Sequence, residues 1–437
     1  MKGIPKDRGL DNSASILKEG YKYISNRRAK FNSDIFKTRF LGESAICISG
    51  EEAAKLFYSD HFTRKNVLPK RIQTSLMGKN GVHMLTGKEH QLRKEMFMSL
   101  MGPDKLDKLK KIAREDWAFY VSKWEKSSSL MLYTEVRELL TRIICEWAGV
   151  PLNEWEVHQR AADLIKMVDS FGGLGVRHQS GKKARQRTES WLRDLIQQTR
   201  DGLLTPPPET GLHVFALSRD ANGDLIDLNV AAVDLLNVLR PTIAITYYIL
   251  FSALALREFP TIRDRLNDEN QHPDYLEWTV HEVRRYYPFV PFLGARVKAD
   301  FEWNNYTFKS GQLVILDVYG INHDPRIWND PSNFRPERFK DWNGSPYNFI
   351  PQGGGDHHKD HRCAGEWVTI ELMKIALEYL GRKMDYQVLD QDLKYDLSRM
   401  PTFPASGFII RDVKLKSEKP IAKSSTKSKT VKEKNES

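Results

Sequence analysis

Cysteine is scarce in this chain of 437 residues. The three cysteines are too few and too far apart for a disulfide framework: Cys47, Cys145 and Cys363. The opening residues, MKGIPKDRGLDNSAS, have no apolar segment of the kind that forms a signal peptide. We therefore expect a cytoplasmic protein in a reducing compartment.

Long uninterrupted apolar runs are also absent. The most apolar segment, residues 235–256, is interrupted by Asn237, Arg240 and Pro241. What remains between the interruptions is too short to cross a bilayer comfortably, which favours a buried core helix. We expect no membrane span.

The net charge of +10 is concentrated at one end of the chain. Residues 414–437 contain eight lysines and three glutamates, a net charge of +5, and almost no large apolar side chains. Such a segment cannot bury enough surface to fold, so we expect one domain at 1–413 and a disordered tail at 414–437. A solvated tail is the first interpretation, and contact with anionic lipid or nucleic acid is the alternative. The body is nearly neutral, which argues against a nucleic-acid-binding protein.

Helical periodicity dominates the rest of the sequence. Between residues 104 and 256, apolar residues recur three and four positions apart, which predicts several long amphipathic helices. Further helices are expected at 277–287 and 366–383, and strand pairs at 38–50 and 301–308. Because no repeat or internal linker is visible, the expected fold is a single, mainly α domain with small β-sheets.

A glycine-rich loop ends in the third cysteine. Residues 350–366 read IPQGGGDHHKDHRCAGE, so Cys363 stands just before a predicted helix, beside His361 and Arg362. These surroundings should lower the pKa of Cys363 and leave a thiolate, which is a strong ligand for a soft metal. Zinc held together with His357 and His361 is one alternative, although no second cluster completes its four ligands. An incidental surface loop, a phosphate-binding loop and a haem iron with an axial thiolate are the others.

Two further motifs favour haem. Glu282 and Arg285, in HEVRRYYP, can pair on one helix face, and FRPERF adds Arg338 from a coil segment. The order Glu-x-x-Arg, Phe-x-Pro-x-Arg-Phe, then a glycine-rich loop with Cys-x-Gly resembles the C-terminal third of cytochromes P450. The resemblance implies the cytochrome P450 fold and a Glu282–Arg285–Arg338 structural network. It also implies haem b, with Cys363 as the axial ligand of the iron.

The long apolar segment carries an Arg240-Pro241 pair where ordinary cytochromes P450 have an acid–alcohol pair. Arg240 stands among leucine, valine and isoleucine, and a buried guanidinium is costly unless a carboxylate pairs with it. Asp234 is one candidate partner, and the carboxylate of a ligand is the other.

The Arg-Pro pair marks a bacterial subgroup of cytochromes P450, the fatty-acid peroxygenases and the related terminal-alkene-forming decarboxylases. The similarity extends over nearly the whole chain, through segments such as LPKRIQTSLMGKNG, EVRRYYPFVPFLGA and LDVYGINHDP. The lysine-rich tail falls outside it.

Similarity to this subgroup implies a particular activity. A long-chain fatty acid would bind with its carboxylate on Arg240, and hydrogen peroxide would be the oxidant, so that no redox partner is required. The substrate carboxylate would do the acid–base work in place of a protein acid. Oxidation at Cα or Cβ would give 2- or 3-hydroxy acids, and loss of carbon dioxide would give a terminal alkene.

The same similarity implies the site residues. The catalytic centre would consist of Arg240, Pro241 and His83, with His83 favouring some decarboxylation; a histidine that only packs is the alternative. The residues expected to contact the haem, beside Cys363, are Arg64, His90, Lys94 and His361. The residues expected to contact the acyl chain are Met77, Val168, Phe171, Phe289 and Phe292. Core packing is the alternative for the acyl-chain residues, and a solvated face is the alternative for the two cations.

Two other functions stay open at this point. A conventional cytochrome P450 fed by a reductase would carry an acid–alcohol pair in its central helix, and this sequence lacks it. A non-catalytic haem-binding or fatty-acid-binding protein would bind without turnover.

Overall fold

Helices predominate in the computed structural model, which describes residues 3–220, 222–268 and 271–416. The α-helices are α1 (Ser13–Glu19), α2 (Tyr23–Phe31), α3 (Glu51–Phe57), α4 (Lys70–Ile72), α5 (Gly87–Met98), α6 (Pro103–Trp124), α7 (Leu132–Trp147), α8 (Val157–Asp169), α9 (Gly175–Arg200), α10 (Gly211–Leu217), α11 (Leu228–Glu258), α12 (Pro260–Leu266), α13 (Tyr275–Tyr286), α14 (Val318–Asn322) and α15 (Glu366–Leu377). The strands are β1 (Ile35–Phe40), β2 (Glu43–Ile48), β3 (Phe62–Thr63), β4 (Leu130–Met131), β5 (Phe292–Val297), β6 (Phe301–Trp303), β7 (Tyr306–Phe308), β8 (Leu313–Asp317), β9 (Met384–Val388) and β10 (Ile409–Leu415). The expected mainly α architecture with small β-sheets is confirmed.

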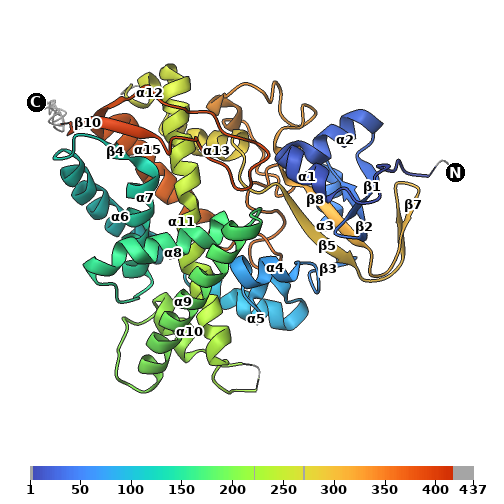
Figure 1. Cartoon of the computed structure of the whole chain (residues 1–437), viewed down its shortest axis with the longest axis horizontal. Coiled ribbons are helices and arrows are strands. Elements are labelled where there is room, and N and C mark those ends of the chain that lie inside the picture. The colour runs from blue at the N-terminus through green and yellow to red at the C-terminus, as the bar shows by residue number, and fades with distance from the viewer. Residues whose placement is uncertain (1–2, 221, 269–270, 417–437) are drawn as a thin grey trace, which may run out of the picture.

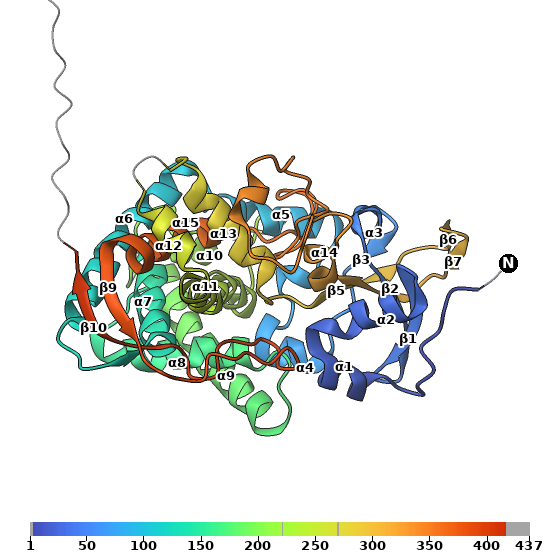
Figure 2. The same cartoon turned by 90° about the horizontal axis from the view of Figure 1, so that it is seen from above.

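Helix α11 is the central element, and the other long helices surround it (Figures 1 and 2). It begins after Asp227, whose carboxylate accepts hydrogen bonds from the N–H groups of Asn229 at 3.0 Å and Val230 at 3.1 Å. Apolar residues occupy every face, so the helix is buried over most of its length, and it continues through Pro241 to Glu258.

The apolar character of α11 agrees with a core position. Within the described ranges it is the single helix that is long and apolar enough to cross a membrane. Of its most apolar 18-residue window, 94% is buried inside the protein, as expected for the core helix of a globular domain.

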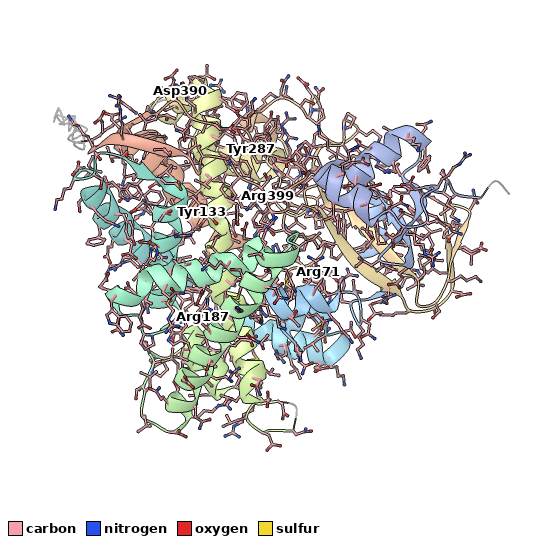
Figure 3. All side chains as sticks on the ribbon, in the orientation of Figure 1. Arg71, Tyr133, Arg187, Tyr287, Asp390 and Arg399 are labelled. Carbon is pink, nitrogen blue, oxygen red and sulfur yellow. The ribbon has the colours of Figure 1, made fainter. Side chains whose placement is uncertain are left out.

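Aromatic side chains hold α11 on two sides. Tyr133 of α7 contacts Tyr247 with ring centroids 6.3 Å apart, and Tyr287, just after α13, stacks on Phe251 at 4.6 Å (Figure 3). Such pairs add to the stability that burial of their area supplies. These contacts hold α11, and with it Arg240, in place among the surrounding helices.

A five-stranded sheet lies beside the helices, on the right in Figure 1. Its order is β1-β2-β8-β5-β3, in which β1 and β2 form the hairpin expected at 38–50 and β8 runs parallel to β2. The second expected hairpin, β6–β7, turns at Asn304 and Asn305, whose φ values of 50° and 59° suit a type I′ turn.

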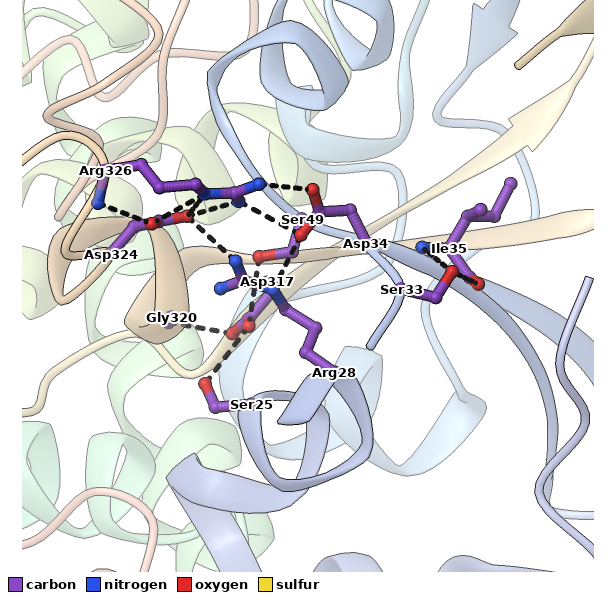
Figure 4. Close-up of polar contacts among 10 residues, drawn as sticks. All are labelled: Ser25, Arg28, Ser33, Asp34, Ile35, Ser49, Asp317, Gly320, Asp324 and Arg326. Atoms are coloured by element: carbon purple, nitrogen blue, oxygen red, sulfur yellow. Dashed lines mark hydrogen bonds and ion pairs between the residues drawn. The ribbon is translucent and has the colours of Figure 1, made fainter. Parts of the chain in front are cut away.

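A buried polar network ties this sheet to α2 (Figure 4). Asp317, at the end of β8, accepts hydrogen bonds from the hydroxyls of Ser25 at 3.2 Å and Ser49 at 3.3 Å. Arg28 of α2 lies 2.9 Å from the carboxylate of Asp324, just after α14. Burial raises the pKa of Asp317 to about 6, so the network holds a carboxylate that is costly to ionise.

The C-terminal segment returns to the helical side of the molecule. Helix α15 continues into a π-helical turn, η6 (Glu378–Lys383), and β10 then pairs with both β4 and β9 in a three-stranded sheet. Strand β10 extends past the expected boundary at Val413 to Leu415. Residues 417–437 lie outside the described residues, so the disorder of the tail stays a prediction.

Candidate active site

The loop before α15 is built around three glycines. Gly353 and Gly355 have φ values of 91° and 79°, which residues with a side chain rarely adopt. The N–H of Gly354 donates to the hydroxyl of Tyr58 at 2.8 Å, and a Cβ at Gly354 would lie 2.4 Å from the carbonyl oxygen of Pro346. A larger residue at any of these positions would displace the loop.

Cys363 ends this loop, just before α15 begins at Glu366. Its N–H donates to the carbonyl of Gln352 at 3.1 Å, and Nε2 of Gln352 lies 3.8 Å from Sγ. The expected lowering of its pKa is wrong for the polypeptide alone. Burial raises the pKa of Cys363, and the Glu366 carboxylate raises it further against the opposite effect of Lys94. A metal cation bound to the sulfur would favour the thiolate.

A zinc site is not supported. Among the residues that the structure describes, there is no group of three or more His, Cys, Asp or Glu side chains that could hold a metal ion. A single buried sulfur ligand instead fits a metal whose other ligands come from a cofactor.

Glu366 connects the cysteine loop to α13 through its carboxylate. Its carboxylate contacts Arg284 and lies 2.7 Å from Nε of Arg362 and 2.9 Å from Nε2 of His357. Burial would raise the pKa of Glu366, but these partners, Arg284 first, outweigh burial and hold it well below its ordinary value. Sequence reasoning missed this cluster, and the available signal was the first arginine in HEVRRYYP, Arg284.

The structure brings Glu282, Arg285 and Arg338 together, each of them buried. Glu282 and Arg285 are bidentate partners on α13, with nitrogen–oxygen distances of 2.7 and 2.8 Å. Arg338 reaches the same carboxylate at 3.1 Å, and the backbone N–H of Arg335 donates to it at 2.7 Å. The carboxylate therefore links α13 to the coil that leads into the cysteine loop.

Arg240 is buried on α11 with 4% of its surface exposed. Its Nη1 donates to the carbonyl of Leu76 and lies 3.8 Å from Sδ of Met77. Burial, and then repulsion from Arg185, lowers the pKa of Arg240 to about 9. No carboxylate contacts it in the described parts of the chain.

The alternative of Asp234 as the partner of Arg240 is wrong. Asp234 forms a buried ion pair with Arg93 of α5 instead. Asp234 and Arg240 are both on α11 but lie six residues apart, which separates them by about 120° around the helix and about 9 Å along it. Arg240 is therefore available to a carboxylate from a ligand.

The two cations expected at the haem are bound to backbone carbonyls. Arg64 donates to the carbonyl of Phe57 at 3.3 Å, with its guanidinium 4.1 Å from the centroid of the Phe57 ring. Lys94 donates to the carbonyl of Arg362, next to Cys363. Neither forms an ion pair within the described ranges, and burial lowers the pKa of Arg64 to about 10. Both can therefore neutralise an anionic group, as the propionates of haem b require.

Three histidines lie beside these cations. The rings of His90 and His361 are 4.0 Å apart. Burial lowers the pKa of both, and the charge of Lys94 adds to this effect. Burial, and then repulsion from Arg240, lowers the pKa of His83 to about 3, so that it is neutral at physiological pH. Nδ1 of His83 is buried and finds no partner among the described residues. An unpartnered buried nitrogen marks a place where a ligand or an ordered water completes the site.

The residues expected along the acyl chain do not form one cluster. Val168 of α8 is buried in the helical core, and Phe289 packs against the same core by stacking on Tyr248 at 4.4 Å. Phe171 follows α8, where its N–H donates to the carbonyl of Val168 at 3.2 Å. Phe292 packs against the apolar cluster of the sheet instead. Met77 is the one of these residues for which a contact with Arg240 is found among the described residues, with Sδ 3.8 Å from Nη1.

Comparison with protein families gives an independent result. The cytochrome P450 family model matches residues 256–401, which include the Glu282 network and the cysteine loop. Taxane 10-beta-hydroxylase of Taxus cuspidata is 22% identical over 427 residues, covering 89% of this chain and 84% of the relative. Cytochrome P450 3A5 of Homo sapiens is 29% identical over 170 residues, covering 35% of this chain and 33% of the relative.

Solved structures are more similar. Ligand-free cytochrome P450 OleT is 40% identical, with a TM-score of 0.92 and coverage of 95% of this chain and 100% of that one. Cytochrome P450EX alpha (CYP152N1) with myristic acid is 43% identical, with the same TM-score and coverage. A mutant of cytochrome P450SP alpha (CYP152B1) is 42% identical, with a TM-score of 0.90 and coverage of 94% and 100%. The chain therefore belongs to the cytochrome P450 family, in the same CYP152 subgroup as P450EX alpha and P450SP alpha, as its motifs predicted.

Proposed function

We propose that this protein uses hydrogen peroxide to oxidise long-chain fatty acids at Cα or Cβ. The products are 2- or 3-hydroxy acids and, where carbon dioxide is lost, terminal alkenes. The observation that carries the proposal is a buried arginine, Arg240, that contacts no carboxylate of the described protein. A fatty acid is the matching ligand class, and structures of relatives hold myristic acid and arachidonic acid.

Arg240 has the properties of a carboxylate anchor. A guanidinium in a low-dielectric site is costly when unpaired, and a carboxylate that binds it with two hydrogen bonds recovers that cost. The apolar surroundings of Arg240 on α11 suit the acyl chain that follows the carboxylate. Met77, whose Sδ lies 3.8 Å from Nη1 of Arg240, is flexible enough to adapt to chains of different shape.

Two polar side chains of α11 close to Arg240 in the sequence are already engaged. The hydroxyl of Thr242, next to Pro241, donates to the carbonyl of Val238 at 3.0 Å. Asp234 is held by Arg93. The carboxylate bound to Arg240 is therefore the group placed to accept and return a proton at the reacting oxygen, which makes the substrate its own acid–base catalyst.

Haem b fits the residues around Cys363. Cys363 would hold its iron through the sulfur, and the bound haem would supply the chemistry that activates peroxide. Arg64 and Lys94 neutralise its propionates, and His90 and His361 pack beside them. Because peroxide supplies both oxygen and oxidising equivalents, no redox partner is needed, and the reducing cytoplasm is the proposed location.

His83 is the residue that we propose to influence the products. It is neutral at physiological pH, and its unpartnered Nδ1 can hold a water or a polar group of the ligand. A water or polar group held there would lie beside the carboxylate site, and we propose that it shifts the products towards some decarboxylation.

The purified holoprotein, a saturated long-chain fatty acid and hydrogen peroxide alone test the function. Mass spectrometry should find 2- or 3-hydroxy acids, terminal alkenes or both. Turnover that requires a reductase and NADPH would indicate a conventional monooxygenase, and no turnover under either condition would indicate a binding protein. Arg240→Leu should lose fatty-acid oxidation while retaining haem, which the absorbance of the bound haem measures.

A further inference from the structure

Two buried arginines share one backbone carbonyl next to the proposed carboxylate site. Arg240 of α11 donates to the carbonyl of Leu76, and Nη1 of Arg185, from α9, donates to the same oxygen at 2.5 Å. Arg185 is 2% exposed. The sequence motifs do not include Arg185, because its contact depends on the approach of α9 to a distant loop.

The carbonyl of Leu76 is free because of the turn in which it lies. Residues Gln73–Met77 form a π-helical turn, η2, which closes with a hydrogen bond from the N–H of Gly78 to the carbonyl of Gln73 at 2.8 Å. The last carbonyls of a helical turn lack donors from the turn itself and carry partial negative charge. Leu76 therefore presents an acceptor that can hold two guanidinium groups.

The two arginines differ in how their charge is balanced. Nε of Arg185 lies 2.6 Å from the carboxylate of Glu189, one turn further along α9. Arg240 contacts no carboxylate in the part of the chain that the structure describes. Repulsion from Arg185 adds to burial in lowering the pKa of Arg240. The pair therefore creates a positive potential that favours an anion at Arg240.

Gly78 leaves the space that Arg185 needs. A Cβ at Gly78 would lie 2.3 Å from Nη2 of Arg185, and the φ of Gly78 is 88°. Nη2 is buried and has no hydrogen-bond partner among the described residues. Arg185 therefore holds this position through its contact with Leu76 and its ion pair with Glu189.

We propose that Arg185 is a positioning residue for the fatty-acid carboxylate, because it keeps the Leu76 carbonyl hydrogen-bonded when Arg240 turns to the substrate. This inference rests on the proposed function. With Arg185 in place, Arg240 can redirect its donors to a carboxylate without leaving a buried acceptor unpaired. Without Arg185, Arg240 is the remaining side-chain donor to Leu76, and binding the substrate costs that hydrogen bond.

Arg185→Met tests the inference, since methionine keeps most of the length of the side chain and removes its charge and donors. Isothermal titration calorimetry on the holoenzyme would compare a saturated fatty acid with the alcohol of the same chain length, which has no carboxylate. We expect the acid to bind about tenfold more weakly, equivalent to about 1.4 kcal/mol, and the alcohol to bind as in the wild type. Arg185→Lys, which keeps a cation and a donor, should restore much of the affinity for the acid.

Arg187→Met is the matched control. Arg187 lies on the same helix (Figure 3) and pairs with Asp163 of α8, but it does not contact Leu76. The Arg187→Met substitution should leave the affinities for the acid and for the alcohol unchanged. Should Arg185→Met fail to fold, Arg185→Gln replaces it with the same expected result.

The outcomes separate this inference from the proposed function. Equal losses for acid and alcohol, or no loss for the acid, would overturn the positioning role of Arg185. If Arg240→Leu binds the acid as tightly as the wild type does, the carboxylate anchor itself is wrong. If Arg240→Leu weakens binding of the acid but Arg185→Met does not, the further inference alone is refuted.

Discussion

Arg240→Leu should stabilise the fold while it removes fatty-acid binding. The substitution replaces a buried cation, which no described carboxylate neutralises, with an apolar side chain in apolar surroundings. The Leu76 carbonyl keeps its hydrogen bond from Arg185. Loss of function and gain of stability would then have one cause, because the uncompensated charge is what binds the substrate.

The pKa of Arg240 sets the upper limit of this effect. Burial and repulsion lower that pKa to about 9. At about 1.4 kcal/mol for each pH unit, the charged guanidinium destabilises the folded protein by no more than about 5 kcal/mol. Loss of one hydrogen bond and imperfect filling by leucine offset part of this gain. We expect the free energy of unfolding to rise by about 1–3 kcal/mol.

Urea unfolding of the holoprotein measures the change, and Arg93→Leu is the matched control. Arg93 is also a buried arginine, but its removal leaves the buried Asp234 carboxyl without its partner, which should cost about 3–5 kcal/mol. A fatty acid at 100 times its dissociation constant should stabilise the wild type by about 2.7 kcal/mol and Arg240→Leu not at all. A loss of stability like that of Arg93→Leu, or stabilisation by the fatty acid that persists, would refute the reasoning.

Three further predictions concern other parts of the molecule. Glu282→Ala leaves Arg285 and Arg338 without their shared carboxylate, so the free energy of unfolding should fall by about 3–5 kcal/mol in urea titrations. His83→Gln should lower the ratio of alkene to hydroxy acid, which gas chromatography measures, and an unchanged ratio would assign His83 to packing. Burial raises the pKa of Asp317 to about 6. Between about pH 4 and 6 the folded protein therefore keeps a proton on this carboxyl that the unfolded chain has lost. The stability of Asp317→Asn relative to the wild type should therefore rise by about 3 kcal/mol between pH 4 and 7, and a flat difference would contradict the raised pKa.

Features that depend on neighbours in the chain could be predicted from the sequence. The turn at Asn304-Asn305 needs two residues that accept positive φ, and both strands beside it are local. The pairing of Glu282 with Arg285 needs a helix and a spacing of three. The apolar pattern of α11 was enough to predict a core helix, although its start at Asp227 was not identified.

Features that depend on burial could not be predicted in the same way. The charges beside Cys363 in the sequence suggested a lowered pKa, but the fold buries the thiol and places the Glu366 carboxylate near it, and both raise the pKa. The sequence motifs assigned no role to Arg284, yet it is buried against Glu366. Periodicity shows which face of a helix is apolar, but it does not show which charged groups from other elements reach that face.

The sequence by itself determined the family and the Arg240-Pro241 pair and predicted Cys363 as the sulfur ligand, because these are matters of residue type and order. The tertiary structure decided how the charges on α11 are balanced. Asp234 meets Arg93 from α5, whereas Arg240 meets the carbonyl of Leu76 and a second arginine, Arg185. These partners come from segments far apart in the chain, and in a buried site of low dielectric such contacts determine whether a charge is neutralised or left for a ligand.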